Sequence, residues 1–405
     1  MAMTRNSFLK TLAGATLGGG VLLGWPERLL QAQEKTRVPV RSTRIRDAEV
    51  FPFQLKQKVV IKISLGSTAT TDNVLVRLRT EDGIVGFGEA SPYAAITGET
   101  QQTSVALGRN LAEMVRGRDP FNIARMVADM EAFAPGNPSI KAAFEMALWD
   151  ICGKITGQPV RYLLGNYRDS FETDLTIFID TPAVTAQAAR DVVSQGFKVV
   201  KVKVGESPEK DAERLRAVRE AVGPDIGLRV DANQGWTPAE AVRGLRAVEK
   251  YQIQFCEQPV VSWDWAGMKF VRDNVDIPIM ADESVHVPHD LIEGIRRDAV
   301  DMVNIKLMKA GGLMQSVRIA QIADAADMKC MLGCMQETRV GLTAAAHVVA
   351  SQKNIQYADL DAFLIHSSDP VIGGMEVKDG QIHLPPAPGL GLDVDPMFLR
   401  QLRAA

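Results

Sequence analysis

Short apolar runs that end in charged or amide side chains recur along the middle of the chain at a nearly constant interval. The five segments are Lys201-Val-Lys203, Asp231-Ala-Asn233, Glu257-Gln-Pro259, Asp282-Glu-Ser284 and Asn304-Ile-Lys306. The charged residues Lys203, Asp231, Glu257, Asp282 and Lys306 follow one another at intervals of 24 to 28 residues. This interval accommodates one strand, one helix and two loops. Charged residues that end buried strands are costly unless they converge. Because strand C-termini converge at the mouth of a (β/α)8 barrel, the pattern predicts an α/β chain with a (β/α)7β TIM-like barrel over residues 173–366.

The 405-residue chain exceeds the usual size of one domain, so a second domain is expected. Alternating runs at 73–79 and 84–90 flank Asp82-Gly83, which is typical of a hairpin, and residues 100–165 have helical spacing. Residues 44–165 therefore predict an α+β capping domain. The tail, residues 367–400, is punctuated by Gly and Pro, and we expect it to return to the capping domain.

The composition restricts the partners. The chain is 46% apolar and 23% charged, with a formal net charge of −3 and no basic run. These values argue against nucleic acid and anionic membrane surfaces. The four cysteines form no C-x-x-C pair, so we predict no disulfide framework. We expect a small-molecule substrate and a homo-oligomer.

Residues 1–34 have the layout of a secretory signal. Arg5 precedes an apolar, Gly-rich stretch at 12–24 that is too short for a comfortable membrane span. Residues 4–10 resemble a twin-arginine signal, although Asn6 stands where the second Arg belongs. We predict an exported, periplasmic protein without stable membrane insertion after processing. A retained N-terminal helix in a cytoplasmic protein is the alternative.

Three carboxylates, Asp231, Glu257 and Asp282, end three successive predicted strands. At one barrel mouth they would repel one another unless a cation neutralised them. Hard oxygen ligands without a nearby His or Cys favour Mg²⁺ over Zn²⁺ or copper. We therefore predict one Mg²⁺ per subunit. The alternative is that each acid only caps the helix that follows it.

Two lysines, Lys203 and Lys306, end the second and sixth predicted strands, which lie across a closed barrel from each other. One lysine could remove a proton from a substrate α-carbon and the other return it on the opposite face, which is racemisation or epimerisation. Lys201 and the metal would lower the pKa of the base and neutralise the enediolate formed. The surrounding valines indicate a buried strand rather than a solvated edge.

Two further carboxylates, Asp359 and Asp361, fall at the predicted end of the eighth strand, by the same interval. Carboxylates at this mouth that are distant from the metal ligands suit a substrate ammonium group. A helix cap followed by a solvated Asp is the alternative interpretation.

Over residues 44–393 these motifs resemble the enolase superfamily, in its muconate-lactonising branch, and among its members the dipeptide epimerases of the L-Ala-D/L-Glu type. The resemblance implies that Lys203 and Lys306 are the bases, that Asp231, Glu257 and Asp282 bind Mg²⁺, and that Asn233 and Glu283 support these ligands. It implies that Asp359 and Asp361 bind the dipeptide's ammonium group and that Lys201 lies near its carboxylate. Further implied substrate contacts are Thr176, Cys334, Met335 and Gln336. Residues 96–99 resemble a specificity loop of the capping domain.

One departure concerns the substrate. Family members that act on Ala-Glu carry an Arg in the capping loop, whereas residues 64–71 contain no Arg or Lys and Gly66 falls near that place. Loss of a charge partner discriminates against an acidic side chain, so we expect a small or apolar second residue, in peptides such as those of the cell wall.

Three alternatives remain. Muconate cycloisomerases and o-succinylbenzoate synthases share the metal site and lysines, but their substrates lack the ammonium group that Asp359 and Asp361 suit. A mandelate-type racemase would need a His base, and none of the five histidines falls at a barrel base position. An inactive peptide-binding protein would have no use for opposed bases.

Overall fold

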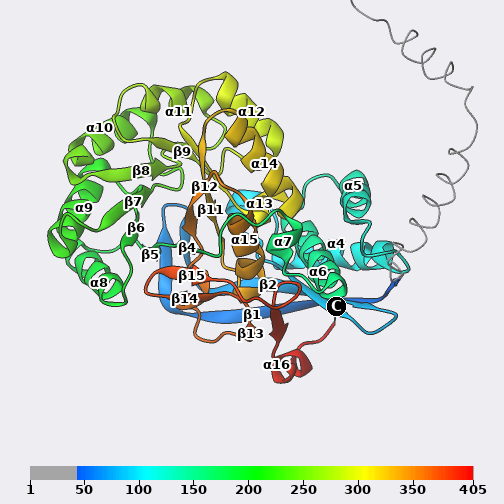
Figure 1. The fold of residues 1–405 in the computed structure, drawn as a ribbon. Helices are drawn as coiled ribbons and strands as arrows, with labels where there is room; N and C mark the ends of the chain where they lie inside the picture. Colours follow the sequence, from blue (N-terminus) through cyan, green and yellow to red (C-terminus); the bar gives the residue numbers. More distant parts are fainter. Residues whose placement is uncertain (1–42, 405) are drawn as a thin grey trace, which may run out of the picture. The chain divides into compact units, whose positions relative to one another are not determined.

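In the computed structural model, which describes residues 43–404, eight parallel strands form one sheet whose order follows the sequence. The strands are β5 (Leu175–Ile177), β6 (Val199–Lys203), β7 (Gly227–Asp231), β8 (Ile253–Glu257), β9 (Ile279–Ala281), β10 (Met302–Ile305), β11 (Lys329–Gly333) and β12 (Ile355–Asp359). The helices between them are α8 (Pro182–Ser194), α9 (Pro208–Val222), α10 (Pro238–Val248), the 3-10 turn η1 (Glu249–Tyr251), α11 (Trp265–Arg272), α12 (Pro288–Arg296), α13 (Leu307–Ala310), α14 (Leu313–Ala325) and α15 (Arg339–Ser351). Figure 1 shows α8 to α11 on the outer side of the strands. After β12 comes the 3-10 turn η2 (Ala362–Ile365), so the (β/α)7β prediction is confirmed.

Local sequence signals set where the first barrel helices begin. Thr181, Ser207 and Thr237 are the N-caps of α8, α9 and α10, and each accepts a hydrogen bond from a backbone N–H three residues on. A proline follows each cap at the first helical position, where its missing N–H costs nothing. These caps fix where the helices begin after β5, β6 and β7.

Closure of the barrel brings the first and last strands together. Across this seam Asp174 N–H donates to Ala358 O at 3.4 Å, and Leu360 N–H donates to Thr173 Oγ1 at 3.1 Å. One hydrophobic cluster joins the strands to the helices around them, and a smaller one of Phe255, Met280, Met302 and Met331 comes from β8 to β11. The closed barrel places Thr176 of β5 beside the residues that follow β12.

The capping domain contains an antiparallel sheet of three strands in the order β1 (Ile45–Ile63), β2 (Gly66–Thr80) and β3 (Val85–Ala90). Its helices are α3 (Ala94–Thr97), α4 (Gln101–Val115), α5 (Ile123–Phe133), α6 (Pro138–Thr156) and α7 (Val160–Leu163). The predicted hairpin is the β2–β3 connection, where Gly83 adopts φ 88°, a value that favours glycine. A second, longer hairpin joins β1 to β2.

The C-terminal tail returns to the capping domain, as expected, but it also pairs with a strand that leads into the barrel. Ser367 N–H donates to Lys56 O at 2.9 Å and Phe398 packs edge-on against Phe53 at 5.6 Å, which ties both ends of the tail to β1. Between them, β14 (Glu376–Lys378) and β15 (Gln381–His383) pair with β4 (Ser170–Glu172), which leads into the barrel. The remaining elements are β13 (Val371–Gly373), β16 (Leu392–Val394), which pairs with it, and α16 (Pro396–Gln401).

The predicted export signal at residues 1–34 lies outside the described residues. Within residues 43–404, no helix is long and apolar enough to cross a membrane. The four cysteines are free thiols, three of them buried and Cys334 partly so.

Candidate active site

Strands β6, β7 and β8 bring their terminal charged residues into register. Lys203 lies opposite Asp231, and Asp231 opposite Glu257, in the parallel ladders. Asp282 directly follows β9, and Lys306 directly follows β10. The carboxylates of Asp231, Glu257 and Asp282 are fully buried, and Lys306 is 4% exposed. The structure therefore brings the five residues together at the C-terminal end of the barrel.

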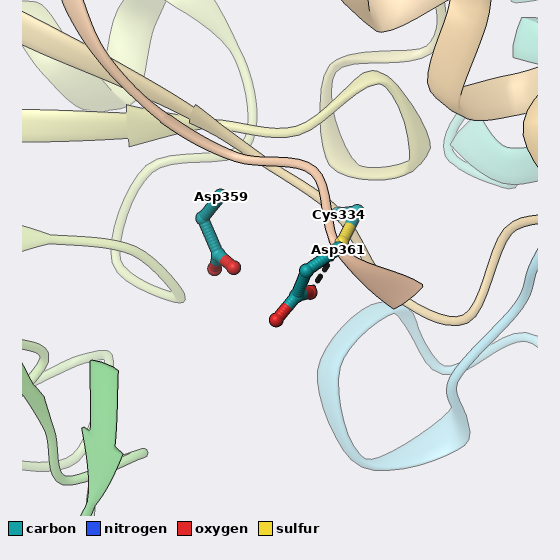
Figure 2. A group of neighbouring side chains, drawn as sticks. All are labelled: Cys334, Asp359 and Asp361. Carbon is teal, nitrogen blue, oxygen red and sulfur yellow. Dashed lines mark hydrogen bonds between the residues drawn. The ribbon is translucent and has the colours of Figure 1, made fainter. Parts of the chain in front are cut away.

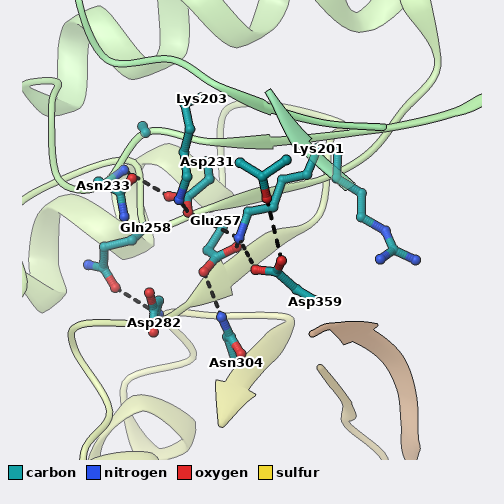
Figure 3. A network of polar contacts seen from close by, with 12 residues as sticks. Lys201, Lys203, Asp231, Asn233, Glu257, Gln258, Asp282, Asn304 and Asp359 are labelled. Carbon is teal, nitrogen blue, oxygen red and sulfur yellow. Dashed lines mark hydrogen bonds and ion pairs between the residues drawn. The ribbon is translucent and has the colours of Figure 1, made fainter. Parts of the chain in front are cut away.

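Lys201 is the centre of a buried charge network (Figure 3). Its Nζ lies 2.7 Å from Glu257 Oε2, 3.2 Å from Asp231 Oδ2 and 2.6 Å from Asp359 Oδ2. Lys203 Nζ lies 2.6 Å from Asp231 Oδ2. Burial opposes the charge of Lys201, but the surrounding acids, Asp359 first, outweigh it and raise the pKa of this lysine. The raised pKa favours the charged form of Lys201 among these carboxylates.

A second pair of lysines holds Asp282. Lys306 Nζ lies 2.8 Å from Asp282 Oδ2, and Lys309 Nζ lies 2.6 Å from Asp282 Oδ1. Burial alone would lower the pKa of Lys306, but Asp282 and Glu257 outweigh it and raise the pKa. The sequence led us to expect a lowered pKa for the base. The pKa of Lys306 rises instead because Asp282 and Glu257, whose negative charge a bound cation would neutralise, act on this lysine directly.

The donor set fits a hard divalent cation. Burial and the neighbouring Asp231 raise the pKa of Glu257 to about 8, although Lys201 opposes this. Glu257 Oε2 and Asp282 Oδ1 are buried and face an ammonium group, yet neither forms an aligned hydrogen bond. Carboxylate oxygens of this kind, together with Asp231, are ligands that Mg²⁺ prefers. The residues present therefore fit Mg²⁺.

Asn233 and Glu283 lie next to these carboxylates and contact each other. Asn233 Nδ2 donates to Glu283 Oε1 at 3.1 Å, and Asn233 N–H donates to Asp231 Oδ1 at 2.9 Å. Burial, then Asp282, raises the pKa of Glu283 to about 7, and Glu283 Oε2 has no hydrogen-bond partner in the part of the chain that the structure describes. Both residues are thus placed to orient the carboxylates.

Three residues at the site had no role in the sequence interpretation. Asn304 Nδ2 donates to Glu257 Oε1 at 2.6 Å, and Gln258 Oε1 accepts from Asp282 N–H at 2.9 Å. Lys309 Nζ, besides its ion pair, donates to Val285 O at 3.0 Å. For Asn304, an amide inside the apolar run of β10 was the available signal, because a buried amide needs dedicated partners.

Asp359 and Asp361 lie close together beside Cys334 (Figure 2), with ligand-type atoms of the three within 4.8 Å of one another. Asp361 Oδ2 accepts from Thr176 N–H at 2.6 Å, and Cys334 Sγ lies 3.8 Å from Asp361 Oδ1. Burial and the neighbouring Asp359 raise the pKa of Asp361 to about 6. Two carboxylates that compete for positive charge form a suitable subsite for an ammonium group.

A cavity of about 510 Å³ connects these groups. Its lining residues from the barrel include Thr176, Lys203, Asn233, Lys306, Cys334, Met335, Gln336, Asp359 and Asp361. The capping domain adds residues of the β1–β2 hairpin and of the segment 91–102. Among the described residues that line the cavity, the cations are Lys203 and Lys306. This volume lies in the range of small-molecule sites.

The capping domain contacts the barrel mouth at the turn between its first two strands. At the β1–β2 turn, Ser64 Oγ donates to Ala232 O at 2.9 Å and to Asn233 O at 2.7 Å. Glu99 of the capping domain lines the cavity, and its carboxylate caps helix α6 of the same domain, because it accepts from Ser139 N–H at 3.0 Å and from Ser139 Oγ at 2.7 Å. Glu99 is thus a helix cap as well as part of the wall.

Comparison with known proteins identifies the family. The family profile "Enolase C-terminal domain-like" matches residues 183–398, and "Mandelate racemase / muconate lactonizing enzyme, N-terminal domain" matches residues 45–165. The hydrophobic dipeptide epimerase of Enterococcus faecalis is 42% identical over 86% of this chain and 99% of its own. A structure of the Enterococcus faecalis dipeptide epimerase with Mg and L-Leu-L-Tyr has a TM-score of 0.85 at 41% identity, covering 86% and 99% of the two chains. A Cytophaga hutchinsonii dipeptide epimerase with Mg and D-Ala-L-Val has a TM-score of 0.88 at 38% identity, covering 89% and 99%.

These matches span both the capping domain and the barrel. The chain therefore belongs to the mandelate racemase and muconate lactonizing branch of the enolase superfamily, and it is an epimerase or racemase acting on dipeptides or amino acid derivatives.

Proposed function

We propose that this protein inverts the α-carbon of the C-terminal residue of a dipeptide whose second side chain is small or apolar. The observation that carries the proposal is the composition of one cavity wall. Lys203, Lys306, Asp359 and Asp361 line the same cavity, while the adjoining β1–β2 hairpin adds a single charged side chain, Asp72, among its described residues. A cavity with that lining accepts an ammonium group and an apolar side chain but offers no spare cation to an acidic one.

In this reaction Lys203 and Lys306 would remove and return the α-proton on opposite faces. Lys201 would stay protonated and stabilise the negative charge that develops on the substrate carboxylate. Asp361 would hold the dipeptide's ammonium group. One Mg²⁺ per subunit, held by Asp231, Glu257 and Asp282, would supply further positive charge toward that carboxylate. The Mg in the structures of the two dipeptide epimerases supports this assignment.

The test is a mass-spectrometric screen of L,L-dipeptide libraries in D₂O with Mg²⁺. We expect a gain of about one dalton on the C-terminal residue, because one α-proton is replaced by deuterium. Uptake confined to dipeptides with an apolar second residue would support the proposal. Uptake on Ala-Glu would contradict the specificity, and no uptake on any dipeptide would favour a cycloisomerase or an o-succinylbenzoate synthase.

We further propose that the protein is exported to the periplasm, acts on peptides such as those released from the cell wall, and forms a homo-oligomer. Residues 1–34 support export through their charged start and short apolar stretch. Cell fractionation of the full chain and of a chain lacking residues 1–34 would test it. Equal distribution of the two between fractions would contradict export, and light scattering of the purified protein would test the oligomer.

A further inference from the structure

The loop that follows β11, residues 334–338, forms part of the cavity wall and is held by side chains of the capping sheet. Gln336 N–H donates to Ser91 Oγ at 3.1 Å. Its carbonyl oxygen accepts from Asn73 Nδ2 at 2.8 Å, and its side-chain Oε1 accepts from Gln57 Nε2 at 3.1 Å. Partners more than 240 residues away in sequence therefore fix the backbone of a residue that lines the cavity.

Behind this loop lies Glu89, a fully buried carboxylate of β3. It accepts hydrogen bonds from Asn73 Nδ2 at 2.8 Å, Thr338 N–H at 3.0 Å, Thr338 Oγ1 at 2.7 Å and Gly341 N–H at 3.1 Å. Thr338 is the N-cap of α15, so Glu89 sits at the positive end of a 13-residue helix. Asn73 links the two sets of contacts, because its amide reaches both Glu89 and Gln336.

The contacts of Glu89 suit an ionised carboxylate. Three of the four groups are N–H donors that cannot accept a proton, and of the four the Thr338 hydroxyl alone could also accept. Burial raises the pKa of Glu89, and the hydrogen bonds from Thr338, Gly341 and Asn73 offset part of that rise. An amide in this place would present its own N–H₂ group to a donor, and the loop would lose part of its support.

We propose that Glu89 and Asn73 are positioning residues that set the loop 334–338 and thereby the fit of the cavity to its substrate. Neither residue is part of the described cavity lining, whereas Cys334, Met335 and Gln336 are. The capping sheet thus controls substrate affinity through backbone positions rather than by touching the dipeptide. The effect on substrate affinity rests on the proposed function, whereas the role of Glu89 and Asn73 in holding the loop does not.

The chain provides a matched control in Glu145. This residue is another fully buried acid of the capping domain, on α6, and it accepts from Met314 N–H at 2.8 Å at the start of the barrel helix α14. Glu89 and Glu145 therefore make the same kind of contact between the two domains. The difference is that helix α13 separates α14 from the cavity-lining Lys306, whereas the cavity-lining loop 334–338 leads directly into α15.

The experiment compares Glu89→Gln, Asn73→Ala and Glu145→Gln in the full-length enzyme, using a dipeptide that the screen has identified. For Glu89→Gln we expect KM to rise on the order of tenfold with kcat within about twofold, because lost positioning weakens ground-state and transition-state binding alike. Asn73→Ala should act in the same direction. Glu145→Gln should lower the melting temperature and leave KM unchanged.

Hydrogen–deuterium exchange gives a readout that needs no substrate. Amides of residues 334–341 should exchange faster in Glu89→Gln and Asn73→Ala but not in Glu145→Gln. Unchanged exchange in this segment, or an equal rise of KM in all three variants, would overturn the proposal. If the unaltered enzyme turned over no dipeptide, the proposed function would fail, and the exchange data would still decide whether Glu89 and Asn73 hold the loop.

Discussion

Lys201 and Asp359 form a buried ion pair, with 2.6 Å between Nζ and Oδ2, that joins the K-x-K segment of β6 to the D-x-D segment at the end of β12. The pair commits Asp359 to the protein's own ammonium group. Asp361, by contrast, is held through Thr176 N–H at 2.6 Å and has no lysine within ion-pair distance among residues 43–404. Of the two carboxylates, Asp361 is therefore the one that we expect to meet a substrate ammonium group.

The affinity for the dipeptide should fall in acid because of Asp361. Burial, then Asp359, raises its pKa to about 6, so the carboxylate takes up a proton as the pH falls through that value. The neutral acid attracts an ammonium group far less, and KM should therefore rise below about pH 6. Asp361→Asn should raise KM on the order of a hundredfold and remove this pH dependence. A dipeptide with an acetylated N-terminus should bind equally weakly to both proteins, and discrimination between them would contradict the assignment.

The two lysines should be separable by isotope exchange. Lys203→Ala or Lys306→Ala should abolish epimerisation, because each lysine serves one face of the α-carbon. Each variant should still exchange the α-proton of one stereoisomer in D₂O, and the two variants should differ in which one. NMR of L,L- and L,D-dipeptides would measure this. Equal loss of exchange from both stereoisomers in both variants would sink the two-base scheme.

A cation placed on the β1–β2 hairpin should open the enzyme to an acidic second residue. Gly66 has open space around it, but its φ of 139° disfavours a side chain, so the adjacent Ser67, which also lines the cavity, is the better position. Ser67→Arg should raise kcat/KM for Ala-Glu about 10- to 100-fold through the new charge pair. Ser67→Gln, similar in reach but neutral, is the control. The same gain in both variants would show that charge is not the cause.

Acid should also weaken the fold through His347. This fully buried ring in α15 accepts Arg161 N–H at Nδ1 at 3.1 Å, and Nε2 lies 3.3 Å from Leu390 O. Burial lowers its pKa to about 4, although the contact with Leu390 opposes this. Because the folded pKa lies below the unfolded value of about 6.5, the stabilisation is complete above that pH and is lost as pH falls toward about 4. The loss is up to about 3 kcal/mol.

His347→Gln keeps a neutral side chain that can accept from Arg161 and donate to Leu390, so urea unfolding should depend less steeply on pH in this range. Part of the dependence should remain, because burial also lowers the pKa of His286 and of His366 to about 4. Exposed His383 provides the control, since His383→Gln should leave the pH dependence unchanged. If His347→Gln and His383→Gln changed the pH dependence of unfolding equally, burial of His347 would not be the cause.

Much of the architecture could be predicted because buried parallel strands are recognisable in the sequence as short apolar runs. Val199 to Val204 form a nearly continuous apolar run, so Lys201 and Lys203 stand out as groups that need partners. The S/T-Pro pairs before α8, α9 and α10 are equally local signals. The pairing of β14 and β15 with β4 had no such signal, because the strands have three residues each and the partners lie about 200 positions apart.

The sequence by itself determined the repeating strand-and-helix unit and the residues at the strand ends, because burial of each strand and the capping of each helix depend on neighbouring residues. Only the tertiary structure decided which of those residues touch. Lys201 contacts Asp231 and Glu257 on the next two strands of the sheet, β7 and β8, and barrel closure adds Asp359 of β12. Glu89 holds Thr338 because the capping sheet packs on the start of α15. Such contacts depend on how whole elements pack in three dimensions, and periodicity along one chain carries no record of that packing.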